Sequence, residues 1–98
     1  MIKVTFYQNG FIATGHANSD EFGHDLVCAG VSAILMGSLN WFDPQISKID
    51  VKDNYIKVII YNPEKLNHLL DLLFIQLSAM IHGNKQYITI QKTTKNCE

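Results

Sequence analysis

Near its N-terminus the chain alternates hydrophobic and polar residues with a period of two, as a strand with one buried face does. This first stretch, residues 2–7, is followed by Asn9-Gly10 and then by a second apolar stretch, residues 11–14. Asn-Gly is a strong hairpin signal, because both central residues of a type I′ turn need a positive φ. We therefore predict a hairpin that turns at Asn9-Gly10.

The alternation recurs in the second half of the chain. Residues 48–52 and 55–60 alternate on either side of Asp53-Asn54, which predicts a second hairpin. A shorter stretch from Tyr87 to Gln91 predicts a last strand, and a polar tail follows it.

Between the hairpins the chain has the pattern of a helix. Asp25 can cap the free amides of a first helical turn, so we expect the helix to begin there. It should reach about Trp41-Phe42, because Asp43-Pro44 cannot continue it. The segment from Gly15 to His24 is rich in turn-forming polar residues and predicts a loop.

A second helix is predicted from Pro63 to about Ile81, with Gly83-Asn84 as its C-terminal signal. Its apolar positions cover more than the ~100° stripe that a surface helix needs. They are Leu66, Leu69, Leu70, Leu72, Leu73, Phe74, Ile75, Leu77, Met80 and Ile81. Two interpretations remain open: the helix is covered on two sides within the monomer, or one of its faces forms a dimer interface.

These elements follow the order β-β-α-β-β-α-β. We expect a single α+β domain over residues 1–98, with one sheet of about five strands packed with two helices. A hydrophobic content of 47% and a formal charge of −1 are those of an ordinary globular protein. The lysines are scattered along the chain, which argues against nucleic-acid binding. No apolar run of ~18 residues predicts a membrane span, and no signal-peptide pattern opens the chain, so we expect a cytoplasmic protein.

Cys28 and His16 are the residues that could carry chemistry. If the helix begins at Asp25, Cys28 lies in its first turn, where the positive end of the helix dipole favours the thiolate. His16 follows Gly15, which permits close backbone approach, and could act as a general base. Ser32 lies one turn after Cys28 on the same helix face.

Other interpretations of Cys28 remain open. An isolated cysteine is often a small buried core residue. His16, His24 and Cys28 could instead offer three metal ligands, but their spacing matches no standard zinc pattern. We expect neither a metal ion nor a cofactor. Two cysteines, one of them beside the C-terminus, do not make a disulfide framework.

The stretches Gly15-His16-Ala17 and Gly23-His24-Asp25-Leu26-Val27-Cys28-Ala29-Gly30-Val31-Ser32 change this picture. They resemble the signature of the ribosomal-processing cysteine protease family, Prp. In that family Gly-His-Ala precedes a loop, and Gly-x-Asp-x-Val-Cys-Ala-x-x-Ser opens a helix. The signature covers about a fifth of the chain.

The resemblance implies a role for each matching position. Cys28 would be the nucleophile and His16 the base, with Asp25, Ser32 and Gly15 supporting the site. A substrate loop would close over the bound peptide; its residues would be Ala17, Asn18, Ser19, Asp20, Glu21, Phe22 and Gly23.

The resemblance also implies a homodimeric endopeptidase that removes a short N-terminal extension from a large-subunit ribosomal protein. The family prefers aromatic residues just before the cut, and Phe22, Trp41 or Phe42 could line a pocket for them. The alternative is a non-catalytic ribosome- or protein-binding module on the same fold. Such a module would tolerate the loss of the Cys28 thiol, whereas a protease would not.

Overall fold

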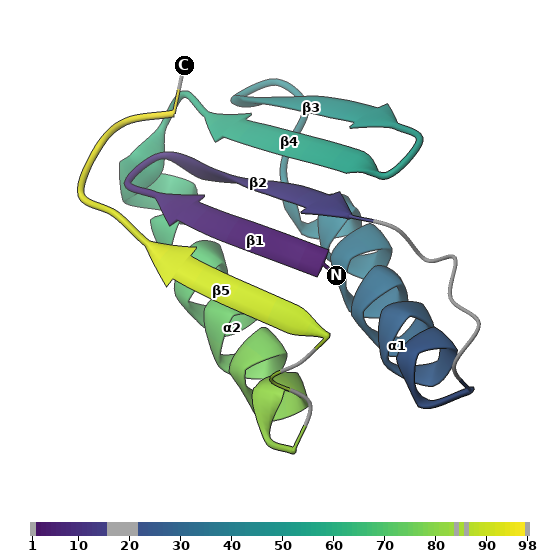
Figure 1. The fold of residues 1–98 in the computed structure, drawn as a ribbon. Coiled ribbons are helices and arrows are strands. Elements are labelled where there is room, and N and C mark those ends of the chain that lie inside the picture. Colours follow the sequence, from purple (N-terminus) through teal and green to yellow (C-terminus); the bar gives the residue numbers. More distant parts are fainter. Residues whose placement is uncertain (1, 16–21, 84, 86, 98) are drawn as a thin grey trace.

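The protein folds as one five-stranded sheet and two helices (Figure 1). The computed structural model describes residues 2–15, 22–83, 85 and 87–97, with the backbone alone for residues 22–26 and 28. The elements are β1 (Ile2–Tyr7), β2 (Gly10–Gly15), α1 (Phe22–Ser38), the 3₁₀ helix η1 (Leu39–Trp41), β3 (Ser47–Lys52), β4 (Tyr55–Ile60), α2 (Pro63–Ile81) and β5 (Ile88–Lys92). The predicted order and fold class are confirmed.

The strands lie in the spatial order β3-β4-β2-β1-β5. The two hairpins pair β1 with β2 and β3 with β4 antiparallel, and β2 joins them by pairing antiparallel with β4. After β4 the chain crosses over through α2, so β5 returns parallel to β1. Both helices lie behind the sheet as it is seen in Figure 1, and they contact each other there. The domain therefore has two layers.

The core lies between the sheet and the helices. The alternating apolar positions of β1 and β2 are buried as predicted, among them Val4, Phe6 and Phe11. The Phe6 ring lies 6.0 Å from that of Phe11 and 5.4 Å from that of Phe74 on α2, centroid to centroid. Phe11 in turn contacts Phe42, which is buried and therefore cannot line an open pocket. These rings join the sheet to α2 and to the segment after α1.

The turn of the first hairpin differs from the prediction. Tyr7 pairs with Gly10, so the turn consists of Gln8 and Asn9 rather than Asn9-Gly10. Neither Asn9 nor Gly10 has a positive φ, and the type I′ prediction is therefore wrong. Asn9 instead binds the C-terminal tail: its Oδ1 accepts from the backbone N–H of Cys97 at 2.6 Å, and its Nδ2 donates to the Cys97 carbonyl at 3.3 Å.

The first helix also begins earlier than predicted, at Phe22 instead of Asp25. An acidic residue is favoured both at an N-cap and within the first turn, because the helix dipole attracts it at either place. Asp25 therefore indicates a helix start without specifying which residue comes first. The helix ends at Ser38, and η1 carries the chain on to Trp41, close to the predicted end.

The second helix has the predicted bounds, Pro63–Ile81, and the second hairpin turns at Asp53-Asn54, where Asn54 has φ of 58°. Among the helices that the structure describes, none is both long enough and apolar enough to cross a membrane.

We predict that Gly10→Ala destabilises the domain by at least about 2 kcal/mol, because overpacking of this kind forces the backbone to move. A Cβ at this position would lie 1.9 Å from the carbonyl oxygen of Val58 on the neighbouring strand. Urea unfolding followed by circular dichroism measures the change. Gly37→Ala is the matched control: a Cβ there meets nothing within 4 Å, and the helix should gain up to about 1 kcal/mol. Equal midpoints for the two variants would contradict the prediction.

Candidate active site

The chain leaves the sheet toward the predicted base at Gly15, the last residue of β2. Gly15 pairs with Ile2 and has φ of 142°, a backbone conformation that residues with a side chain rarely adopt. Its N–H donates to the carbonyl of Asn54 at 3.2 Å. The β3–β4 turn thereby holds the end of β2. His16 follows directly and lies outside the described residues.

Cys28 lies in the second turn of α1, six residues after Phe22. The expectation of a first-turn thiol is therefore wrong, and with it the argument from the helix dipole, which acts mainly within that turn. The unpaired amides of a helix belong to its first four residues, so they lie ahead of Cys28. A thiolate at Cys28 would need a source of stabilisation other than the helix dipole.

The face of α1 that Cys28 occupies follows from the helical repeat. Val27, Val31 and Leu35 recur at intervals of four and are buried against the core. Cys28 lies one residue further around the helix, and Ser32 follows it one turn later on the same row. Ser32 is half-buried. Ser32 thus lies at the border between the core and the outside.

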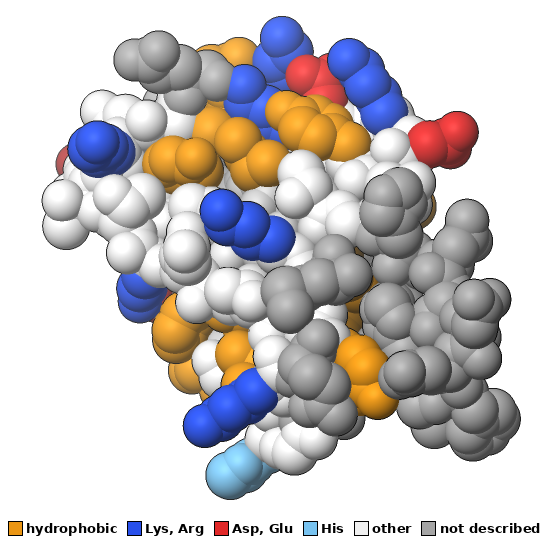
Figure 2. Space-filling model, in the orientation of Figure 1, with side chains coloured by type: hydrophobic (Ala, Val, Ile, Leu, Met, Phe, Trp, Pro, Cys, Tyr) orange, Lys and Arg blue, Asp and Glu red, His pale blue; other side chains and the backbone are white. Residues whose placement is uncertain are grey.

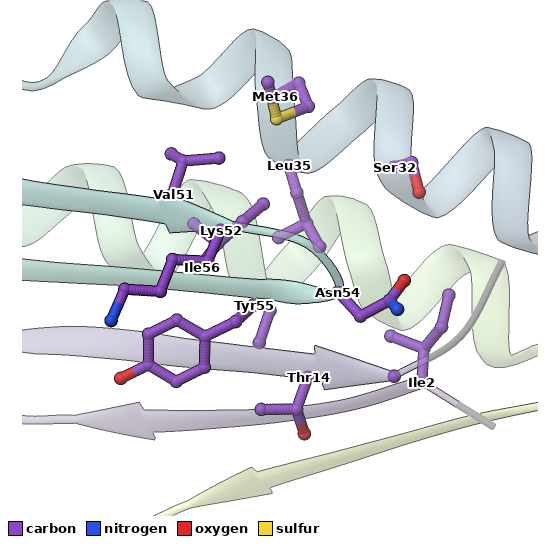
Figure 3. Close-up of a pocket in the computed structure, with 12 residues that line it drawn as sticks. Ile2, Thr14, Ser32, Leu35, Met36, Val51, Lys52, Asn54, Tyr55 and Ile56 are labelled. Atoms are coloured by element: carbon purple, nitrogen blue, oxygen red, sulfur yellow. The ribbon is translucent and has the colours of Figure 1, made fainter.

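This border opens into a cavity of about 160 Å³ between α1 and the sheet (Figure 3). Ser32, Leu35 and Met36 form the wall on α1. The remaining lining residues come from the ends of β1 and β2 and from the β3–β4 hairpin; they are Ile2, Ala13, Thr14, Gly15, Val51, Lys52, Asn54, Tyr55 and Ile56. Figure 3 shows Ser32 and Asn54 at the same end of the cavity, with Met36 and Val51 at the other.

The cavity has an apolar wall and a polar border. Met36 and Val51 are about half exposed, at 49% and 47%, although both are hydrophobic. Asn54 supplies an amide group and Ser32 a hydroxyl group at the other end, whereas the side chains of Thr14 and Tyr55 point away from α1. An extended peptide could place an apolar side chain against the first group and its backbone against the second.

The structure brings two of the predicted site residues, Gly15 and Ser32, to one cavity. Asp25 is the fourth residue of α1 rather than its cap. Phe22 and Gly23 lie on α1, so the predicted loop is shorter than expected at its end. The rest of that loop, residues 17–21, lies outside the described residues.

Sequence reasoning missed the contribution of the β3–β4 hairpin. The sequence predicts the hairpin that contains Val51, Asn54 and Tyr55. Nothing in the sequence pattern of these residues places the hairpin beside Gly15. The pairing of β2 with β4 brings the hairpin to this position, and the sequence analysis predicts no strand order. Among the described residues, no group of three or more His, Cys, Asp or Glu side chains could hold a metal ion.

Comparison with known proteins identifies the family of this chain. The model of the family described as cysteine protease Prp matches residues 1–89. The ribosomal processing cysteine protease Prp of Mycoplasma genitalium is 33% identical over 98 residues, which cover 94% of this chain and 96% of the relative.

Two solved structures of the S. aureus protein are also similar. Its complex with a substrate peptide superposes with a TM-score of 0.80 at 24% identity, over 95% of this chain and 100% of the other. Its complex with a covalently linked product peptide gives 0.75 at 25% identity, over the same shares. At 24% identity, the similarity to the substrate complex concerns the fold alone. The match of the family model over residues 1–89 is what assigns the chain to a family. The chain belongs to the cysteine protease Prp family.

Proposed function

We propose that the protein is a cysteine endopeptidase that removes a short N-terminal extension from a large-subunit ribosomal protein in the cytoplasm. Cys28 is the nucleophile and His16 the base. The observation that carries the proposal is the cavity: its α1 wall continues by one turn to Cys28, and its sheet wall ends at Gly15, the neighbour of His16. Membership of the Prp family supports the reaction type, and the description of its relatives as ribosomal processing proteases supports a ribosomal substrate.

The reaction is an acyl transfer. His16 takes the proton of the Cys28 thiol, and the thiolate attacks the scissile carbonyl. As the tetrahedral intermediate collapses, the C–N bond breaks and His16 returns the proton to the leaving amine, which is the new N-terminus of the ribosomal protein. The extension stays on Cys28 as a thioester until water, deprotonated by His16, releases it as a carboxylate.

The supporting residues have roles that agree with their positions. Gly15 adopts φ of 142°, which sets the direction of the chain just before His16. Ser32, one turn after Cys28, is placed to hydrogen-bond to the substrate beside the cut. Asp25 lies within the first turn of α1, where its carboxylate stabilises the helix that carries the nucleophile.

The cavity supports the preference for an aromatic or large apolar residue near the cut. Its volume of about 160 Å³ suits one such side chain, and Leu35, Met36, Val51 and Ile56 give it an apolar lining. Burying a side chain of this size contributes about 1.5–3 kcal/mol to binding.

Val51→Asp should lower kcat/KM for a peptide with an apolar residue next to the cut by about tenfold, which is the loss of roughly 1.4 kcal/mol of that burial. Steady-state kinetics on such a peptide measures the effect. Tyr61→Asp introduces the same charge at an exposed position outside the cavity and should leave kcat/KM within twofold of wild type. An equal loss in both variants would argue against the cavity as the binding site.

The decisive experiment on catalysis incubates wild type and Cys28→Ala with a peptide that spans the extension, followed by mass spectrometry. Wild type should make a single cut, and Cys28→Ala should be at least about 10³-fold slower, because removal of a nucleophile abolishes covalent catalysis. Cys97→Ala is the control, since Cys97 lies outside the residues that match the family model and should retain activity.

No cut by wild type under reducing conditions would overturn the proteolytic function. Equal cutting by Cys28→Ala would overturn the assignment of the nucleophile. Binding without cleavage, unchanged in Cys28→Ser, would instead favour the non-catalytic binding module.

We also propose that the protein forms a homodimer through the outer face of α2. Leu72 and Ile75, one turn apart, are 50% and 64% exposed although both are large hydrophobic residues. Their burial against a second copy would explain why the apolar positions of α2 exceed what the core uses. Leu70, Leu73 and Leu77 of the same helix already fill the core side.

Leu72→Glu combined with Ile75→Glu should convert the dimer to a monomer, because two carboxylates would be buried at the interface. Sedimentation velocity at micromolar concentration gives the mass. Asn40→Glu, at an exposed polar position outside α2, should remain dimeric. A monomeric wild type, or a double variant that is still dimeric, would refute this interface.

A further inference from the structure

The outer face of the sheet is covered by no described element, because α1 and α2 both lie on the other side (Figure 1). In β1 the buried residues alternate with outward ones, and the pairing register extends the same two faces across β2 and β4. Figure 2, drawn in the same orientation, shows several lysine side chains on this face among hydrophobic and other side chains. This face plays no part in the protease site beyond its border with the cavity.

Four of the eight basic residues of the chain point outward on this face: Lys3, Lys48, Lys52 and Lys57. Only one of the nine acidic residues, Asp50, points outward from the same strands. The chain as a whole has a formal charge of −1, so the sheet face is positive while the rest of the molecule is negative. Lys3, Lys48 and Lys52 are exposed.

The pairing register sets the distances between these lysines. Lys3 pairs with Thr14, Thr14 with Tyr55, and Tyr55 with Lys52, so the two lysines lie at the ends of one row. Strands lie about 4.8 Å apart, which separates the ends of this row by about 14 Å. Lys48 lies four residues before Lys52 on the same strand, about 13 Å away. Positions far apart in the sequence thus form one charged surface that measures about 14 Å across the strands and about 13 Å along them.

Two tyrosines lie on the same face, and their neighbours are small. Tyr55 lies beside Thr14, and Tyr7 lies beside Gly10, which has no side chain. Both rings are half-buried, and the Lys52 Nζ lies 6.0 Å from the centre of the Tyr55 ring. Aromatic rings on an open sheet between cationic side chains are the means by which sheet platforms bind single-stranded nucleic acid.

We infer that the open face of the sheet binds single-stranded RNA, with the lysines on phosphates and the tyrosines under bases. A symmetric dimer through this face is disfavoured, because it would bring like charges together. An acidic segment such as polyglutamate would use the lysines but carries no aromatic ring to stack on the tyrosines. The sequence argues against nucleic-acid binding because the lysines are scattered along the chain. The strand register nevertheless brings four of them to one face of the sheet.

The test is fluorescence anisotropy with a labelled 12-nucleotide RNA of mixed sequence, from 50 to 200 mM NaCl. Wild type should bind with Kd of about 10⁻⁵ M at the lowest salt, in the range of non-specific binding. Three phosphate contacts predict a slope of log K against log salt of about −2, since each contributes about −0.7 for single strands. No binding at 50 mM NaCl with 100 μM protein would overturn the inference.

Lys3→Gln combined with Lys48→Gln should reduce the slope to about −0.7 and weaken binding at least tenfold at 50 mM NaCl. Neither residue lines the cavity, so peptide cleavage serves as the check on folding. The matched control is Lys65→Gln with Lys85→Gln, which removes the same charge from exposed positions outside the sheet. Equal weakening in both pairs would overturn the inference, because net charge alone would then explain binding. Equally tight, lysine-dependent binding of polyglutamate would overturn it in favour of an acidic protein.

Discussion

The period-two register of the β1–β2–β4 pairing is the constraint on which the rest of this structure depends. A slip of one residue in any of these strands would move its apolar side chains from the helix side to the open side. Phe6, Phe11 and Val58 would then leave the core, and α2 would lose the surface it covers. The same register sets Gly15 opposite Ile2 at one end of the sheet. Packing and site are therefore specified together.

The placement of both helices on one face divides the molecule into surfaces of different chemistry. The helix side contains the aromatic core, and at its border α1 and the strand ends enclose the cavity. α1 contributes to both the core and the cavity wall, because neighbouring residues on a helix point about 100° apart. Val27 and Val31 thus anchor the helix to the core, while Ser32, in the same row as Cys28, reaches the cavity.

The two local errors of the sequence prediction have a common cause. Asn9-Gly10 and Asp25 are residues that several local structures favour equally. At Asn9-Gly10 contacts far along the chain decide the outcome: Asn9 binds the backbone of Cys97, and Gly10 is required by the approach of Val58 on β4. At Asp53-Asn54 the predicted turn forms, with Asn54 at φ of 58°.

The sequence by itself determined the element order, the two hairpins, the bounds of α2 and the signature that contains His16 and Cys28, because alternation, helical repeat and motif spacing are local properties. Tertiary structure alone decided the strand order. That order brings Asn54 to Gly15, makes Val51 and Tyr55 part of the cavity, and aligns Lys3 with Lys52. These contacts join strands that are distant in sequence, and their energies depend on how the buried faces of the whole sheet fit against α1 and α2, which no local pattern contains.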